Sequence, residues 1–392
     1  MTEPDGVVRI LIVDDSAVMR SLLRAVLMTD ARLEVLTTAS DGESGLRAME
    51  TMRPDLVLLD VEMPVMDGLS TLRAMRDRGL RVPVIMCSTL TQRGAQVTME
   101  ALATGAADYV AKPSGQPSRE AAVDALAHDL IPKILALTTR STMVMNPLRT
   151  TAGVLPPLTP SVPGAAIFEA NRGTAPSGSA GHAGTSAAPR AVVMGVSTGG
   201  PAALDMLLPA LPGNFPLPVL VVQHMPELFT KLLAERLDSR CALRVVEAQE
   251  EMAVESGHVY VAKGDWHMEL AAGGRRLRLT QALPENHCRP SVDVLFRSAA
   301  AVWGNGVLGV ILTGMGADGL AGCRMIQARG GSVLAQDQET SAVWGMPGAV
   351  AQAGLAMKVL PLQAIAGELM QMAHRKSGAG SGVETMRQKW AV

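Results

Sequence analysis

The sequence is short of the features that mark several large classes of protein. Aromatic residues make up only 3% of its 392 residues, and the net charge is −2 with no long run of one sign. A basic surface for binding nucleic acid is therefore not expected. No apolar stretch approaches the roughly 18 residues of a membrane-spanning helix, and the N-terminus lacks the pattern of a secretory signal. These absences predict a cytoplasmic protein without membrane insertion.

Cysteine is equally sparse. The four cysteines lie far apart in the sequence and form no CxxC pair; they are Cys87, Cys241, Cys288 and Cys323. Such spacing predicts neither a disulfide framework nor a zinc knuckle. The chain instead contains 48% hydrophobic residues, including 24 methionines, which is enough for sizeable cores of aliphatic and thioether side chains. A length of 392 residues favours two or three domains.

The first third of the chain alternates short apolar runs with amphipathic stretches. The predicted strands are the apolar runs at 7–13, 33–37, 56–59, 82–87 and 107–111. The stretches between them are predicted helices, and a last helix is predicted at 118–137. Five buried strands separated by helices indicate a doubly wound α/β domain with a five-strand parallel sheet, which we place at residues 7–137.

A change of composition separates this unit from a second one. Residues 138–189 are rich in proline, glycine and small polar residues, which predicts a flexible linker. Its simplest role is that of a spacer, and a short docking segment at Ile167-Phe168 is the alternative. A second alternating pattern at 190–373 predicts a larger, mainly parallel, doubly wound α/β domain. Residues 374–392 are polar and predict a mobile tail.

Charged and polar residues stand at the ends of the strands predicted in the first domain. Asp14 and Asp15 follow the first strand, and Asp60 ends the third. Ser88 follows the fourth strand, and Lys112 closes the fifth. In a parallel sheet these positions share the carboxyl edge, where ligands bind. Three carboxylates repel one another, and Mg²⁺ offsets the repulsion because it prefers oxygen ligands. Asp60 can then attack phosphorus, with the lysine and the serine contacting the transferred group.

Together these positions resemble the response-regulator receiver family over the whole of the first domain. The resemblance implies transfer of a phosphoryl group from a histidine kinase to Asp60. It also implies that Asp15 and the backbone carbonyl of Glu62 hold Mg²⁺ beside Asp60, with Asp14 in support. Tyr109, in the fifth strand, is expected to move with the loop that carries the serine hydroxyl.

In the second domain, Gly-x-Ser-x-Gly at 195–199 directly follows an apolar strand. The motif places Ser197 on a sharp turn at a helix N-terminus. Backbone N–H groups there, including that of Thr198, can form an oxyanion hole. A glycine-rich loop that binds phosphate has the same strand–turn–helix context. Taken alone, the motif supports the two interpretations equally.

Two further residues complete a possible catalytic triad with Ser197. His224 lies just past an apolar strand and is the candidate base. Asp318 lies in a glycine-rich loop after another apolar strand, where it would orient the imidazole. The order along the chain is Ser, His, Asp, whereas α/β-hydrolases have Ser, then Asp or Glu, then His. An ordinary lipase-like fold is therefore not expected.

The second domain is similar to the catalytic domain of the chemotaxis protein-glutamate methylesterase family. The matching motifs are, in order, Gly-x-Ser-Thr-Gly-Gly, Gln-His-Met-Pro, His-Met-Glu-Leu, Arg-Pro-Ser-Val-Asp-x-Leu-Phe and Thr-Gly-Met-Gly-x-Asp-Gly. The resemblance implies hydrolysis of glutamate γ-methyl esters on the cytoplasmic helices of methylated chemoreceptors, with release of methanol. It implies no cofactor at the esterase site and an oxyanion contact from the Met315 backbone. Members of the family can also deamidate receptor glutamines.

The resemblance further implies that the unphosphorylated receiver blocks the active site and that phosphorylation of Asp60 opens it. One position departs from the family pattern, because Cys288 stands where members often carry a histidine, and His287 lies one residue earlier. Arg289 has two interpretations, substrate binding or a structural ion pair. The alternative function is a response regulator whose output domain binds a phosphate or nucleotide without catalysis.

Overall fold

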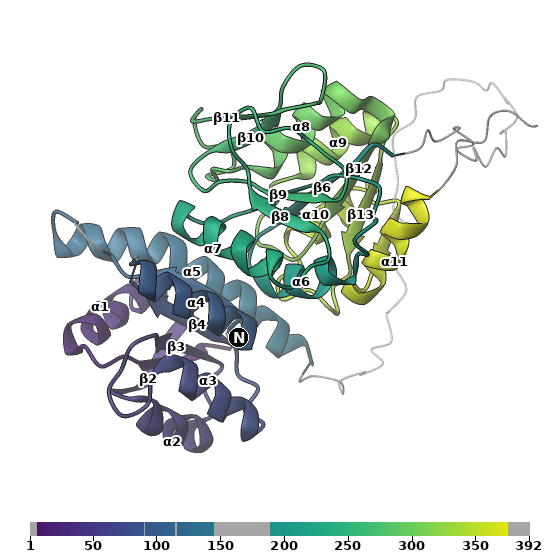
Figure 1. Cartoon of the computed structure of the whole chain (residues 1–392). Coiled ribbons are helices and arrows are strands. Elements are labelled where there is room, and N and C mark those ends of the chain that lie inside the picture. The colour runs from purple at the N-terminus through teal and green to yellow at the C-terminus, as the bar shows by residue number, and fades with distance from the viewer. Residues whose placement is uncertain (1–5, 90, 114–115, 145–188, 375–392) are drawn as a thin grey trace, which may run out of the picture.

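The computed structural model describes four stretches of the chain, residues 6–89, 91–113, 116–144 and 189–374. These residues form two lobes that lie in contact (Figure 1). Most of the predicted linker lies outside the described residues, as do the segment Ile167-Phe168 and nearly all of the predicted tail. Among the helices that are described, none combines the length and apolar character needed to cross a membrane.

The first lobe alternates strands with helices. Its elements are β1 (Val8–Val13), α1 (Ala17–Leu27), β2 (Leu33–Ala39), α2 (Gly42–Met52), β3 (Leu56–Asp60), α3 (Gly68–Asp77), β4 (Val84–Ser88), α4 (Gln92–Thr104), β5 (Asp108–Ala111) and α5 (Arg119–Val144). Its described strands form one parallel sheet in the order β2-β1-β3-β4-β5. The predicted doubly wound, five-strand parallel sheet is therefore confirmed.

Alternate side chains of each strand face opposite sides of this sheet. In β1, Ile10 and Ile12 pack with α1 and α5, whereas Leu11 and Val13 pack with the cluster that contains α2, α3 and α4. Helices α1 to α4 each follow a Ser, Asp or Thr whose side-chain oxygen accepts a backbone N–H of the first turn. Burial on both faces thus explains why the apolar runs of β1, β3 and β4 become the central strands, and local capping fixes where the helices begin.

Helix α5 is longer than the sequence pattern indicates. The prediction ended at residue 137, but the helix reaches Val144 and contains Pro132. The change of composition was misleading, because no proline or glycine interrupts the chain between residues 138 and 144. The Thr138 hydroxyl also returns a hydrogen bond of 2.8 Å to the carbonyl of Ile134, so this polar residue is accommodated within the helix.

The second lobe holds the remaining described elements. They are β6 (Ala191–Val196), α6 (Gly200–Leu207), β7 (Val219–Gln223), α7 (Glu227–Asp238), β8 (Arg244–Glu247), β9 (His258–Val261), β10 (His267–Leu270), β11 (Leu277–Thr280), α8 (Val292–Trp303), β12 (Val307–Ile311), α9 (Leu320–Ala328), β13 (Ser332–Gln336), α10 (Met346–Gln352), β14 (Lys358–Leu360) and α11 (Leu362–Ala373). The short strand β14 lies at one edge of the sheet of this lobe.

Seven of the described strands form a parallel sheet in the order β14-β13-β12-β6-β7-β9-β8, and β10 pairs with β11 as an antiparallel hairpin. The predicted larger, mainly parallel α/β domain is therefore confirmed. Helices α6, α7 and α11 pack on one face of the sheet, and α8, α9, α10 and the hairpin pack on the other. From β6 the chain adds strands on one side and later returns to β12 on the other. The loops after β6, β7 and β12 therefore meet at the carboxyl edge, at the topological switch point.

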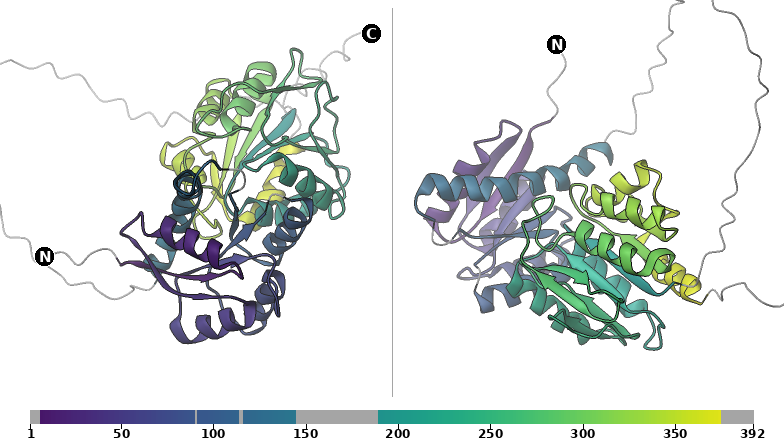
Figure 2. Two further views of the ribbon diagram at one scale, coloured as in Figure 1. Left: turned by 90° about the vertical axis from the view of Figure 1, so that its left-hand side faces the viewer. Right: turned by 90° about the horizontal axis from the view of Figure 1, so that it is seen from above.

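The two lobes share an apolar contact. Helix α4 of the first lobe packs against α6 and α7 of the second. The Tyr109 ring, in β5, stacks on that of Phe229, in α7, with centroids 4.5 Å apart. The buried cluster that includes both rings extends into the cores of both lobes. Figure 2 shows the lobes in contact from two further directions. This contact places β5, an edge strand of the first sheet, beside the carboxyl edge of the second sheet.

Candidate active site

The turn between β6 and α6 has the shape of a nucleophile elbow. Ser197 lies on it, and its backbone N–H bonds to the carbonyl of Thr313 in the loop after β12, over 3.0 Å. Gly199 has a φ of 76°, in the left-handed region, and a Cβ there would lie 2.5 Å from the Cβ of Ala342. Only glycine therefore fits at Gly199 without strain. The tight turn brings the serine to the N-terminus of α6.

His224 and Asp318 form the charged pair of the site. His224 Nε2 lies 2.8 Å from Asp318 Oδ2, and the Asp318 side chain is only 3% exposed. The Val292 amide also donates to Oδ2, over 2.7 Å, and Ser291 Oγ donates to Oδ1, over 2.9 Å. Since the carboxylate holds Nε2, the nitrogen of the imidazole left to accept a proton is Nδ1. The Ser197 hydroxyl makes no hydrogen bond to His224, both residues being within the described part of the chain.

The electrostatics of the pair are set by burial and mutual attraction. Burial alone would lower the pKa of His224, but the hydrogen bonds to Asp318 and Cys288 outweigh it, and the pKa is raised above the ordinary imidazole value. Burial alone would raise the pKa of Asp318, but its bonds to His224 and the Val292 amide outweigh that effect and lower it. The aspartate therefore stays ionised and stabilises the imidazolium that forms when His224 accepts a proton.

Two supporting residues were not expected from the sequence. Gln223 is buried at the end of β7, and its Nε2 donates to the backbone carbonyls of Ser197, over 3.0 Å, and His224, over 3.3 Å. Asn286 Nδ2 donates to Asp318 Oδ1, over 2.8 Å, and to Asp293. A glutamine inside an apolar strand was a usable signal for Gln223. Nothing in the sequence places Asn286 beside a residue 32 positions later.

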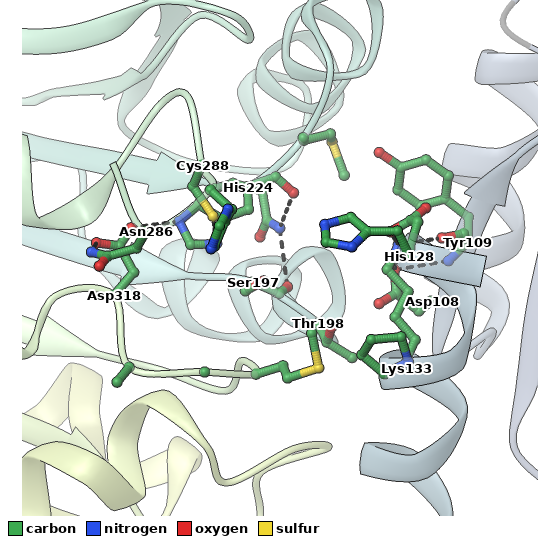
Figure 3. A pocket seen from close by; sticks show the side chains of 18 of the residues that line it. Asp108, Tyr109, His128, Lys133, Ser197, Thr198, His224, Asn286, Cys288 and Asp318 are labelled. Atoms are coloured by element: carbon green, nitrogen blue, oxygen red, sulfur yellow. Dashed lines mark hydrogen bonds and ion pairs between the residues drawn. The ribbon is translucent and has the colours of Figure 1, made fainter. Parts of the chain in front are cut away.

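A cavity of about 430 Å³ joins these residues (Figure 3). Of the predicted esterase residues, the structure brings Ser197, Thr198, His224, Met315 and Asp318 to its wall. On the other side, the cavity is lined by residues of β5 and α5 in the first lobe, namely Asp108, Tyr109, His128, Asp129, Pro132 and Lys133. The site therefore lies between the lobes, and the first lobe forms part of its wall.

Arg289 does not line the cavity. Its Nη2 lies 2.6 Å from Asp265 Oδ1, and its Nη1 donates to the carbonyl of Ala282 over 3.0 Å. Its side chain is 22% exposed. The geometry therefore supports the structural ion pair rather than substrate binding, since the donors of the guanidinium face protein acceptors.

The acidic residues of the first lobe also converge. Carboxylate oxygens of Asp14, Asp15 and Asp60 lie within 4.8 Å of one another. Lys112 Nζ lies 2.9 Å from Asp14 Oδ2 and 2.8 Å from Asp60 Oδ1. Burial raises the pKa of Asp60 to about 6, against the opposing effect of Lys112. Three converging carboxylates are a hard oxygen donor set, which fits Mg²⁺.

The remaining receiver residues take different positions. Ser88 is buried at the end of β4, with Oγ 2.7 Å from Thr98 Oγ1. The Glu62 side chain is exposed and pairs with Arg93 over 3.3 Å, which leaves the backbone carbonyl as its candidate metal ligand. Tyr109 is not at the acidic cluster but in the contact between the lobes, where burial raises the pKa of its hydroxyl.

Comparisons with known proteins agree with the two-lobe division. The family described as "CheB methylesterase" matches residues 192–369, and the family described as "Response regulator receiver domain" matches residues 10–135. A protein-glutamate methylesterase/protein-glutamine glutaminase from a Nocardioides species is 48% identical over 371 residues, which cover 94% of this chain and 96% of the relative. The protein of the same name from Trichodesmium erythraeum is 43% identical over 365 residues, covering 93% and 98%.

A solved structure is also similar to part of the chain. The crystal structure of the Thermotoga maritima CheB methylesterase catalytic domain shares 46% sequence identity with it. The match covers 47% of this chain and 98% of that one, with a TM-score of 0.46.

Proposed function

The chain belongs to the family of protein-glutamate methylesterase/protein-glutamine glutaminases with a receiver domain, and from this premise we propose how its residues perform and control the reaction. The substrate is a glutamate γ-methyl ester on the cytoplasmic helices of a chemoreceptor, and the product is methanol. The observation that carries this proposal is the His224–Asp318 pair beside Ser197 at one cavity. A non-catalytic phosphate site would need neither residue, and the relatives do not support that alternative.

Ser197 is the nucleophile and His224 is the base. Ser197 Oγ attacks the ester carbonyl, and its proton passes to Nδ1 of His224 while Asp318 holds Nε2. The backbone N–H groups at the start of α6, including that of Thr198, and that of Met315 stabilise the oxyanion. The C–O bond of the ester then breaks, and methanol leaves with the proton from His224.

Water completes the cycle. His224 removes a proton from water, which attacks the acyl carbonyl, and Ser197 leaves as the alcohol with that proton. The product is the glutamate side chain. A receptor glutamine enters the same sequence with ammonia as the leaving group, which accounts for the second activity in the relatives' name. None of these steps of ester or amide hydrolysis requires a metal or cofactor.

The first lobe is the receiver. Asp60 accepts a phosphoryl group from a histidine kinase, while Asp14, Asp15 and the Glu62 carbonyl, with Asp60, would hold the Mg²⁺ that such transfer uses. Bound there, Mg²⁺ would neutralise charge on the phosphoryl oxygens. Lys112 and Ser88 bind the transferred group, a role that the ion pair of Lys112 with Asp60 supports. We assign the receiver to residues 7–137, the linker to 138–189, the catalytic domain to 190–373 and the tail to 374–392, with α5 extending past the first boundary.

The described arrangement corresponds to the inhibited state. Side chains of β5 and α5 line the esterase cavity, and Tyr109 stacks on Phe229, so a receptor helix cannot approach Ser197 without moving the receiver. Phosphorylation of Asp60 draws Ser88 and its loop inward, moves Tyr109 and favours a state with the cavity open. A cytoplasmic location follows from the proposed substrate and phosphodonor.

The test measures methanol released from methylated receptor membranes by the full chain. Ser197→Ala is expected to abolish release while retaining labelling of Asp60 by acetyl phosphate, which shows that the receiver is folded, and a thermal midpoint like that of the wild type, which shows the same of the catalytic domain. Ser239→Ala, an exposed serine at the end of α7, is the matched control and is expected to behave as wild type. Substantial methanol release by Ser197→Ala would refute the assignment of the nucleophile.

A further inference from the structure

The esterase cavity contains a thiol that the proposed reaction does not use. Cys288 Sγ lies 3.6 Å from His224 Nδ1, the nitrogen that must accept the serine proton. Ligand atoms of Cys288, His224 and Asp318 all lie within 4.8 Å of one another. Figure 3 shows the sulfur beside the imidazole, on the wall of the cavity. A sulfur and an unprotonated imidazole nitrogen are a preferred pair of ligands for Zn²⁺.

The separation of the two atoms is compatible with a shared zinc ion. Zinc binds thiolate at about 2.3 Å and imidazole at about 2.05 Å, so two such ligands at a tetrahedral angle are separated by about 3.6 Å. The observed 3.6 Å between Cys288 Sγ and His224 Nδ1 matches this value. The two atoms are therefore at a separation from which both can bind one ion.

Asp318 completes the pattern without being a ligand itself. A zinc-binding histidine normally donates its other ring N–H to a carboxylate, which fixes its tautomer and raises its basicity. Here Asp318 Oδ2 accepts from the Nε2–H of His224, over 2.8 Å. Its Oδ1 accepts from Ser291, Asn286 and two backbone amides, so its oxygens are engaged in orienting the site. Cys288 and His224 both line the cavity, whose wall also includes Ser197 and His287.

We propose that Cys288 and His224 form a Zn²⁺ site and that zinc bound there inhibits the esterase reversibly. The binding half stands on the geometry alone, whereas the inhibition rests on the proposed role of His224 as base. The thiol releases its proton as the metal binds, and Nδ1 then has no lone pair for the proton of Ser197. The same ligand set discriminates against Mg²⁺, which prefers the carboxylates of the receiver.

The binding test uses full-length protein with saturating Mg²⁺, which occupies the receiver carboxylates, and a fluorescent chelator competing for added Zn²⁺. The wild type is expected to bind about one Zn²⁺ with release of a proton. Cys288→Ser is expected to lose this binding, and Asp318→Asn to weaken it by roughly 10- to 100-fold. Cys241→Ser, a half-buried thiol outside the cavity, is the matched control and is expected to bind as wild type. Zinc binding that is absent in the wild type, or unchanged in Cys288→Ser, would overturn the proposal.

Co²⁺ gives a second readout that does not depend on activity. Cobalt bound by a thiolate shows a charge-transfer absorption in the near ultraviolet, which is expected in the wild type and in Cys241→Ser but not in Cys288→Ser. In the methanol assay, Zn²⁺ is expected to inhibit the wild type and a chelator to restore it. Zinc binding without methanol release under any condition would refute the esterase and leave the site standing. Methanol release that continues with zinc bound would refute the inhibition.

Discussion

At the scale of single residues, the pKa of His224 determines how the rate depends on pH. The catalytic base must be unprotonated, and its contacts with Asp318 and Cys288 raise its pKa above the ordinary value near 6.5. In metal-free buffer, kcat/KM is therefore expected to rise with pH through a midpoint above that value. Cys288→Ser removes one group that raises the pKa, so the midpoint is expected to move to lower pH. Cys241→Ser serves as the control, and a midpoint that moved upward in Cys288→Ser would contradict the electrostatic account.

Gln223 is expected to position two catalytic residues at once. Its amide spans the backbone carbonyls of Ser197 and His224, and Gln223→Leu removes both hydrogen bonds while keeping a similar volume. Small displacements of reacting groups can cost up to about 100-fold in rate, so we expect kcat to fall by roughly 10- to 100-fold with KM little changed. The thermal midpoint should move by only a few degrees. A large fall in Tm with an unchanged kcat would show that Gln223 serves stability alone.

At the scale of elements, the elbow before α6 depends on backbone conformation. Gly199→Ala forces an alanine into the left-handed region, where it also meets Ala342. We expect it to lower the free energy of unfolding by about 1–2 kcal/mol and to reduce kcat, measured by denaturant titration and methanol release. Gly367→Ala is the matched control, because Gly367 lies within α11 with nothing near its missing Cβ. This substitution is expected to raise the free energy of unfolding by up to about 1 kcal/mol. Equal effects of the two substitutions would contradict the role of the turn.

The same scale shows which features the sequence could predict. Ser197, His224 and Asp318 each follow an apolar strand, and parallel strands collect such residues at one edge, so their convergence on one cavity could be predicted from pattern and spacing. Contacts made by irregular loops could not be predicted in this way. Asn286 and Cys288 reach the site from a loop whose path depends on tertiary packing, and the sequence does not indicate that Arg289 pairs with Asp265. The end of α5 was missed because composition marked the linker before the helix signal ended.

At the scale of the whole molecule, the receiver and the esterase share both an apolar cluster and a cavity. Under the proposed function, a signal at Asp60 would pass through the contact between the lobes, because the residues of the acidic cluster do not line the cavity. Tyr109 is suited to this role. Its strand, β5, is the neighbour of β4, the strand that ends at the buried Ser88. The backbone carbonyl of Tyr109 accepts a hydrogen bond from Lys133, and its ring stacks on Phe229. Movement of this one side chain would thus break the stack and change the wall of the cavity, which Tyr109 helps to form.

Tyr109→Leu is therefore expected to activate the unphosphorylated enzyme. An aromatic stack contributes about 0.5–1.5 kcal/mol beyond its buried area, so its loss shifts the balance between closed and open states by roughly 2- to 12-fold. Basal methanol release should rise by that factor, whereas phosphodonor should stimulate this variant less than wild type. Combining Tyr109→Leu with Asp60→Asn should keep the raised basal rate, because the open state no longer needs the phosphoryl group. It should also abolish stimulation by phosphodonor, because the asparagine cannot accept that group. A basal rate that falls or stays unchanged, in protein whose thermal midpoint shows it folded, would mean that the stack does not hold the receiver over Ser197.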